Sequence, residues 1–161
     1  MASMVSQRDP LRTQLIRILD WEEAHVGFDK AIDGIPPRKR GRRPPGLEHS
    51  IWELLEHMRI TQQDILDFCV DSLYEHRLKW PDDYWPTVAA PTDAAWMKSL
   101  AAFKQDREAM KRLVRKTDNL YAPVPTGKPN QTYLRAVLLL TAHNAYHLGQ
   151  IVDVRRASGI W

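Results

Sequence analysis

The chain has 161 residues, of which 43% are apolar, and a formal net charge of +3. This length is typical of one domain that buries its own core, and the charge is too small to indicate nucleic-acid binding by itself. No apolar run approaches the ~20 residues that span a bilayer, and the N-terminus lacks the apolar stretch of a secretory signal. We therefore expect a single cytoplasmic domain over residues 1–161, with no membrane partner.

The chain has a single cysteine, Cys69, which excludes two kinds of cysteine chemistry. One thiol cannot form an intrachain disulfide, and it cannot build a cysteine-based zinc site. Cys69 falls on the apolar face of its predicted helix, which favours a small buried hydrophobe over a nucleophile.

The first half of the chain contains two long segments with helical periodicity. The first helix is predicted over residues 9–33, with Asp9 as its N-cap and Pro10 at its first helical position. The second is predicted over residues 50–73, because the Ser-Ile-Trp-Glu sequence at its start matches a capping box.

The second half repeats this organisation, with helices predicted over residues 92–117 and 131–157. Residues 80–86, which include three aromatic rings, and residues 121–129 are expected to be irregular connections. No strand pattern competes with this reading. Four helices of ~24 residues, each about 36 Å long, bury their apolar faces most readily against one another. The predicted fold is all-α, a four-helix bundle, with the order of its helices left open.

A basic segment lies between the first two predicted helices. Residues 38–43, Arg-Lys-Arg-Gly-Arg-Arg, place five cations between two pairs of prolines. One interpretation is a solvated basic loop, and the other is a patch for an anionic substrate, partner or phosphate backbone. We favour the solvated loop, so a nucleic-acid partner is not the expectation.

The fourth predicted helix has polar residues on its apolar face. His143 and His147 are four residues apart and share one face of a helix, and Asn144 lies near the middle of the apolar stripe. Burying such groups without partners costs about 1–3 kcal/mol each. Either hydrogen bonds within the bundle or a metal ion must therefore satisfy them.

A third histidine, His57, strengthens the metal interpretation. If the second and fourth helices are neighbours, His57 faces the pair across the bundle, and bundles commonly build sites from facing helices. Imidazole suits zinc, nickel, copper and iron. His25, a turn past Trp21, is a candidate for lining the pocket, whereas His49 and His76 are expected to have surface or capping roles.

Two segments resemble the signatures of the DinB/YfiT-like superfamily. They are Ile-Trp-Glu-Leu-Leu-Glu-His-Met over residues 51–58 and His-Asn-Ala-Tyr-His-Leu-Gly-Gln-Ile over residues 143–151. The similarity extends across nearly the whole chain. The resemblance implies a four-helix bundle, often dimeric, that holds one divalent metal through His57, His143 and His147. Zinc and nickel are both compatible with three imidazoles.

The resemblance also implies a range of activities. Some members of the superfamily are metal-dependent transferases that activate a low-molecular-weight thiol, such as bacillithiol or mycothiol, and others resemble hydrolases or isomerases. We therefore expect thiol transfer to a small electrophile. The alternatives are metal-dependent hydrolysis, a metal- or ligand-binding stress protein without turnover, and nucleic-acid association through the basic segment. Three neutral ligands leave the charge of the ion uncompensated, which supports either a bound hydroxide or a bound thiolate.

Further residues are candidates for surrounding this centre. Asn144 stands where the His-Glu-x-x-His metalloproteases have their general base, so peptide hydrolysis by that route is not expected. Glu53, one turn before the ligand on the second helix, is expected to be the capping-box acid, with orientation of that ligand as the alternative. Gln150 is a further candidate for orienting a ligand. Trp85, with Tyr84, either covers the site as an apolar acceptor pocket or closes the end of the bundle.

Overall fold

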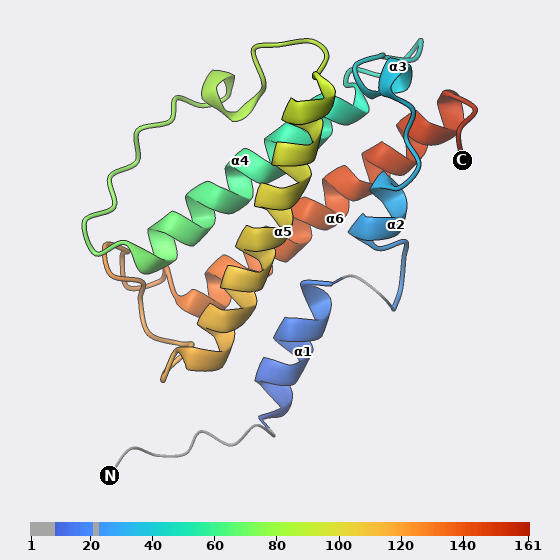
Figure 1. The fold of residues 1–161 in the computed structure, drawn as a ribbon. Coiled ribbons are helices and arrows are strands. Elements are labelled where there is room, and N and C mark those ends of the chain that lie inside the picture. Colours follow the sequence, from blue (N-terminus) through green and yellow to red (C-terminus); the bar gives the residue numbers. More distant parts are fainter. Residues whose placement is uncertain (1–8, 21–22) are drawn as a thin grey trace.

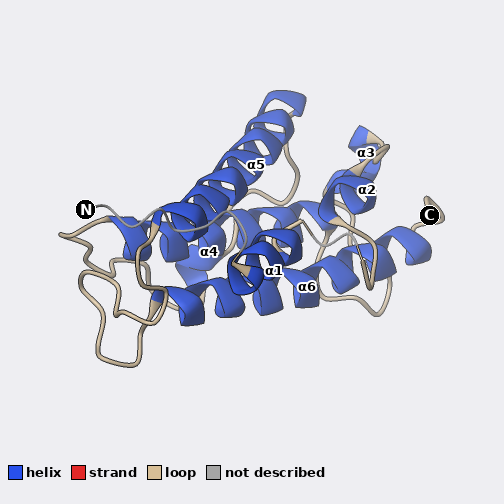
Figure 2. Ribbon diagram, turned by 90° about the horizontal axis from the view of Figure 1, so that it is seen from below, coloured by secondary structure: helices blue, strands red, loops and turns tan. Residues whose placement is uncertain are grey.

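The computed structural model describes residues 9–20 and 23–161, and every regular element among them is helical (Figures 1 and 2). In chain order the helices are α1 (Pro10–Ile18), α2 (Phe28–Ile32), α3 (Pro37–Arg40), α4 (Ile51–Val70), α5 (Asp93–Lys116) and α6 (Tyr133–Ala157), with a 3-10 turn at Asp82–Tyr84. The expected all-α class is confirmed. None of the helices in these residues has the length and apolar character needed to cross a membrane.

The three long helices form the centre of the molecule. α4 packs along both α5 and α6, and α1 packs against α5 and α6. Figure 1 shows the long helices side by side, with α1 below them. The shorter helices cover the other end, where α2 lies against α6 and α3 against α4. The contact between α4 and α6 is the one that positions the candidate site.

Polar caps set the starts of the long helices. At α4 the Ser50 hydroxyl accepts from the Glu53 backbone N–H at 3.2 Å, and the Glu53 carboxylate accepts from the Ser50 N–H at 2.7 Å. Thr92 and Thr132 cap α5 and α6 in the simpler one-bond manner. These bonds satisfy N–H groups that have no partner inside the helix. The expected starts at residues 50, 92 and 131 therefore lie within two residues of the observed ones.

The prediction of one continuous helix over residues 9–33 is wrong. α1 ends at Ile18, and α2 begins after Gly27, whose backbone is extended at φ −74° and ψ 162°. The two parts also pack into different regions of the core. Leu19 joins a cluster with Met110, whereas Phe28 joins another cluster and stacks on Phe103 with ring centroids 4.0 Å apart. Helical spacing is present on both sides of the break, so periodicity alone does not reveal it.

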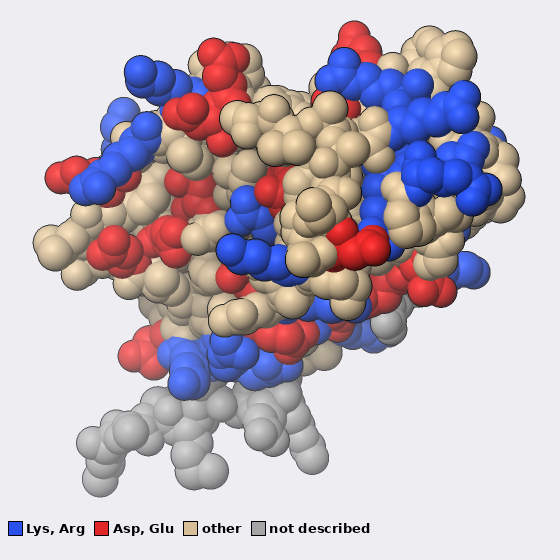
Figure 3. Space-filling view, turned by 45° about the horizontal axis from the view of Figure 1, so that its top comes forward, with Lys and Arg blue, Asp and Glu red and all other residues tan. Residues whose placement is uncertain are grey.

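The basic segment is only in part the solvated loop that the sequence favoured: residues 37–40 form α3, whereas Arg38, Arg42 and Arg43 are exposed. Arg40 lies 4.6 Å over the Trp96 ring and pairs with Asp93 at 2.6 Å. In addition, Arg43 bonds with the Glu53 carboxylate and Lys39 donates to the Ser158 carbonyl at 3.0 Å. In Figure 3 basic side chains gather at the upper right, at the end of the molecule where Figure 1 shows α3. Three of the five cations thus hold the segment onto the helices.

A glycine makes this packing possible. Gly41 lies so close to the segment before α5 that an added Cβ would be 2.5 Å from the Ala90 Cβ and 2.6 Å from the Ala89 carbonyl oxygen. Any side chain at this position would push the two segments apart. Glycine is therefore required here by close approach rather than by an unusual backbone angle.

We expect Leu140→Ala to lower the free energy of unfolding by about 2–5 kcal/mol, because it empties part of a packed cluster. Leu140 is fully buried on α6 in the cluster that contains Met110 and Val114. The matched control is Leu73→Ala, at a side chain that is 83% exposed, where a change of less than about 0.5 kcal/mol is expected. Urea unfolding followed by circular dichroism measures both. Equal losses in the two variants would contradict the assigned core.

Candidate metal centre

Three histidines converge between α4 and α6. One ring nitrogen each from His57, His143 and His147 lies within 4.8 Å of the other two. In residues 9–20 and 23–161 this is the one group of three or more His, Cys, Asp or Glu side chains arranged in this way. The Nε2 atoms of His57 and His143 are 3.0 Å apart. The structure therefore brings together the three residues that the sequence indicated as ligands.

The His57 ring is oriented by the aromatic segment before α5. Its Nδ1 atom lies 2.9 Å from the backbone carbonyl oxygen of Tyr84. A carbonyl oxygen can only accept, so Nδ1 carries the ring proton and donates it. The Tyr84 hydroxyl in turn donates to Asp64 at 2.7 Å, which ties the segment back to α4.

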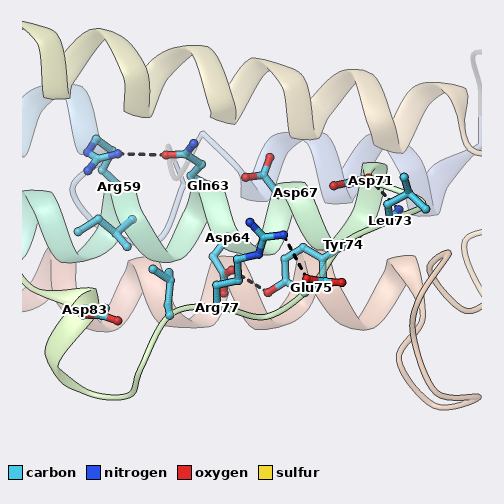
Figure 4. A pocket seen from close by; sticks show the side chains of 12 residues that line it. Arg59, Gln63, Asp64, Asp67, Asp71, Leu73, Tyr74, Glu75, Arg77 and Asp83 are labelled. Carbon is cyan, nitrogen blue, oxygen red and sulfur yellow. Dashed lines mark hydrogen bonds and ion pairs between the residues drawn. The ribbon is translucent and has the colours of Figure 1, made fainter.

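Asp64 also receives a second tyrosine. The Tyr74 hydroxyl donates to it at 2.7 Å, and Figure 4 shows the two side chains facing one another. They border a surface cavity of about 520 Å³ between α4 and the segment that follows it, with Arg59, Asp67 and Arg77 among its lining residues. The three histidines do not line this cavity, so it adjoins the centre rather than containing it.

The two histidines of α6 have acceptors on the same helix. His147 Nδ1 lies 2.6 Å from the Gln150 side-chain oxygen. His143 Nδ1 lies 3.5 Å from the Asn144 side-chain oxygen. Asn144 and Gln150, which the sequence indicated as candidates near the metal, therefore each lie beside one of the three histidines. With these acceptors, each ring can carry its proton on Nδ1 and present an Nε2 lone pair to a cation.

The Nε2 atoms of His57 and His143 share either a proton or a cation. They face each other at 3.0 Å, and because His57 carries its proton on Nδ1, its Nε2 accepts from a proton on His143 Nε2 or binds a cation together with it. Nitrogen ligands of zinc lie about 2.0–2.1 Å from the ion, which places two of them about 3.4 Å apart in a tetrahedral site. Because magnesium and calcium prefer oxygen ligands, three imidazoles fit a transition metal better. The donor set therefore fits a metal ion.

Burial keeps these histidines neutral. It lowers the pKa of His143 to about 4, with a further contribution from the neighbouring His147. Burial also lowers the pKa of His147 to about 4 and outweighs the opposing effect of its bond to Gln150. The pKa of His57 is lowered by the same cause. Only the neutral imidazole binds a metal, so protons do not compete for the site near neutral pH.

Trp85 covers one side of the cluster. Its ring stacks on His57 with centroids 4.1 Å apart and planes 6° apart, and it also stacks on His49 at 4.2 Å. Its edge lies toward His147, at 6.3 Å between centroids. Trp85 thus lies against the cluster, which is one of the two positions that the sequence left open. His49 has a packing role there that the sequence did not reveal, because the contact depends on how the loop folds back.

Two other candidates lie outside the cluster. Glu53 is the capping-box acid, and its bonds in the described chain go to Ser50 and Arg43 rather than to His57. His25 lies in the turn between α1 and α2, where its Nδ1 atom is 2.9 Å from the Val26 carbonyl oxygen. It lines a surface cavity together with Asp20 and Asp29, and its role as a pocket residue of the metal centre stays a prediction.

Gln62 is the polar residue that the sequence analysis missed. It is completely buried on α4 and donates to the Phe103 carbonyl oxygen at 2.7 Å. Its own side-chain oxygen accepts from Asn144 at 3.1 Å. The signal was present in the sequence, since Gln62 falls on the apolar stripe between Met58 and Leu66. The reasoning that selected Asn144 on its helix applies equally here.

The single cysteine takes no part in this centre. Cys69 is 1% exposed, and burial raises the pKa of its thiol to about 12. It packs in a small cluster with Val124 and Ala136. The interpretation of Cys69 as a buried hydrophobe agrees with this position.

Together these features define an all-α protein with a largely buried three-histidine cluster suited to a metal ion. The chain belongs to the DinB superfamily, because the family model for that superfamily matches residues 20–151. The matched region includes all three histidines, α4, α5 and most of α6. No match was found among curated proteins or among solved structures.

The metal-free protein should lose stability as the pH falls from 7 to 5. The folded pKa values of His143 and His147, about 4, lie below the ordinary value of 6.5. Between these values the unfolded chain binds more protons than the folded one, so stability rises with pH in this window. The loss of stability due to these two histidines is absent above about pH 6.5 and grows as the pH falls toward their folded pKa.

Urea unfolding at pH 7, 6 and 5 in the presence of a chelator measures this dependence. Because carboxylates also titrate, the informative comparison is with the double variant His143→Gln, His147→Gln. Its stability should change less over the same pH range. Identical pH dependence in the two proteins would show that these histidines are not held neutral by burial.

Proposed function

We propose that this protein binds one divalent transition metal, zinc or nickel, and uses it to transfer a low-molecular-weight thiol to a small electrophile. The ligands are the Nε2 atoms of His57, His143 and His147. The observation that carries the proposal is the convergence of three imidazoles, with one ring nitrogen of each within 4.8 Å of the other two. In this proposal α1, α4, α5 and α6 count as the four helices of a DinB-type bundle.

The charge of the site supports sulfur chemistry. When bound, an ion with three neutral ligands keeps its full positive charge and stabilises a thiolate, the nucleophilic form of a thiol. The thiol gives its proton to solvent, its sulfur forms a bond to the electrophilic carbon, and the leaving group departs with the bonding electrons. The chain contributes the neutral ligands, fixes their orientation and excludes water from their buried side.

Aromatic rings beside the cluster support an apolar electrophile. Trp80 is 71% exposed and its ring centroid lies 6.5 Å from that of His57. Tyr146 is 67% exposed and packs edge-on against His147 at 4.9 Å. Large apolar rings left in solvent next to reactive groups are typical of binding-site walls. A small uncharged electrophile would gain from contact with them.

Hydrolysis is the second candidate, because the same positive charge lowers the pKa of bound water to about 7. The described residues place no carboxylate in the cluster to serve as a general base for that water. This difference is the reason for preferring thiol transfer. A thiolate attacks without such a base.

The metal part of the proposal predicts about one zinc or nickel ion per wild-type chain purified without a histidine tag. His147→Ala should lose it while keeping its helical circular dichroism, because one of three ligands is gone. His25→Ala is the matched control, since it also removes an imidazole but leaves the cluster intact, and it should bind as wild type does. Elemental analysis measures all three. A wild type that stays metal-free after incubation with both ions would refute the metal site.

The reaction part predicts that the metal-loaded protein accelerates thiol consumption by an aryl halide by at least about tenfold over the uncatalysed rate. The panel contains bacillithiol, mycothiol and glutathione, and the decrease in free thiol is followed with time. His143→Ala should show only the background rate. If no thiol reacts faster while an ester or amide is hydrolysed, the activity is hydrolysis and thiol transfer is wrong.

A further inference from the structure

The segment between α4 and α5 reaches the metal centre with little regular structure of its own. Residues 71–92 contain one 3-10 turn, at Asp82–Tyr84. The segment nevertheless supplies two groups to His57, the Tyr84 carbonyl oxygen 2.9 Å from Nδ1 and the Trp85 ring stacked at 4.1 Å. Irregular connections longer than about 12–15 residues are usually functional or disordered. Because this one has a defined position at His57, contacts with the helices must fix it.

Asp64 on α4 supplies such a contact twice. Its Oδ1 accepts from the Tyr74 hydroxyl and its Oδ2 from the Tyr84 hydroxyl, both at 2.7 Å. Hydrogen bonds to an ionised carboxylate are stronger than those between neutral groups. Tyr84 is only 6% exposed, so water is a poor substitute for this partner. One carboxylate therefore joins α4 to two points of the segment that are ten residues apart.

Other contacts of the segment are less directional or lie further along it. Trp52 donates to the Val88 carbonyl oxygen at 2.9 Å, which holds the part after Tyr84. In the part before it, the Tyr74 ring lies edge-on to Phe68, and the segment borders a cavity of about 520 Å³ (Figure 4). Ring contacts tolerate sliding, whereas a hydrogen bond has a preferred distance and direction. The shared carboxylate thus gives this part of the segment its directional attachment to α4.

We propose that Asp64 is a positioning residue for His57: through the two tyrosines it holds the Tyr84 carbonyl at Nδ1 and so leaves Nε2 to bind the metal. This inference rests on the proposed metal function. Asp64 follows His57 by two turns of α4, about 10 Å along the axis, so it acts through the segment rather than by contact. A ligand whose outer nitrogen is held by a backbone carbonyl keeps its ring orientation and its tautomer.

The first test follows the His57 ring proton in the metal-free protein, by NMR of isotope-labelled histidine. In wild type this proton should be on Nδ1 and should exchange slowly with water. In Asp64→Ala its exchange should be at least about tenfold faster, because the carbonyl moves away from the ring more often. Zinc affinity, measured by competition with a chelating dye, should fall about 10–100-fold, as is typical when an outer partner of a metal ligand is lost. A wild-type His57 protonated on Nε2, or unchanged exchange and affinity in Asp64→Ala, would overturn the proposal.

The matched control is Asp67→Ala, one turn further along α4. Asp67 borders the same cavity, and neither tyrosine donates to it. Its replacement removes an equal charge from the same surface, so ring-proton exchange and zinc affinity should equal those of wild type. Equal losses in Asp64→Ala and Asp67→Ala would assign the effect to negative charge and contradict positioning through the tyrosines.

Two further variants separate positioning from charge and from folding. Asp64→Asn removes the charge but keeps an oxygen that accepts and an NH₂ group that donates, so it can still bond to both hydroxyls. It should keep slow exchange and zinc affinity within a few-fold of wild type, whereas a pure charge effect would make it as weak as Asp64→Ala. The pair Tyr74→Phe, Tyr84→Phe keeps both rings, removes both donors and should reproduce the losses of Asp64→Ala. This pair provides the test if Asp64→Ala does not fold, and wild-type behaviour in it would also overturn the proposal.

The two readouts distinguish this proposal from the metal function on which it rests. If wild type binds no zinc but ring-proton exchange still depends on Asp64, the positioning stands and the proposed metal function fails. If wild type binds zinc and Asp64→Ala binds it equally well, the metal function stands and the positioning fails.

Discussion

The convergence of three imidazoles on one point is the constraint around which this structure is organised. Three neutral rings present lone pairs to one point only if each Nδ1 finds an acceptor elsewhere. Those acceptors come from three places: the Tyr84 carbonyl before α5, the Asn144 amide within the core, and the Gln150 amide on α6. The segment between α4 and α5 is consequently part of the centre. Its bond to His57 and the stack of Trp85 on the same ring hold it there.

Four cations of the chain bond to other parts of the fold. Arg40 and Arg43 bind carboxylates on α5 and α4, and Lys39 binds a carbonyl just after α6. On α6 itself, buried Arg155 donates to the Ala31 and Asp33 carbonyls, both at 2.7 Å. These bonds fasten the short helices α2 and α3 to the long ones. The basic segment therefore offers less free charge to an anionic partner than its sequence suggests.

The sequence predicts this molecule best where the determinants are local. A cap lies within three residues of the helix it starts, so the beginnings of α4, α5 and α6 follow from Ser50, Thr92 and Thr132. Likewise, His143 and His147 share a face because of their spacing alone. The break between α1 and α2 is different, because it results from packing against two separate clusters.

Around the metal centre, too, some residues could be predicted from local sequence and others depend on the folded chain. Asn144 is visible in the sequence as a polar residue on an apolar stripe, and Gln62 could have been found by that rule. The stack of His49 on Trp85 could not, since it joins the residue before α4 to a ring in an irregular segment. No periodicity connects those two positions. Only the path of the folded loop brings them within 4.2 Å of one another.

If the proposed thiol transfer takes place, the burial of Cys69 protects the protein from the electrophile that it uses. Reagents that accept sulfur from a small thiol also alkylate exposed protein thiols, and a catalyst working among them risks covalent self-inactivation. Here the chain's single thiol is 1% exposed and, with a pKa of about 12, is almost never a thiolate at neutral pH. The single thiol of the chain is therefore a poor target for a soft electrophile, and in the proposed transfer the sulfur comes from a second small molecule.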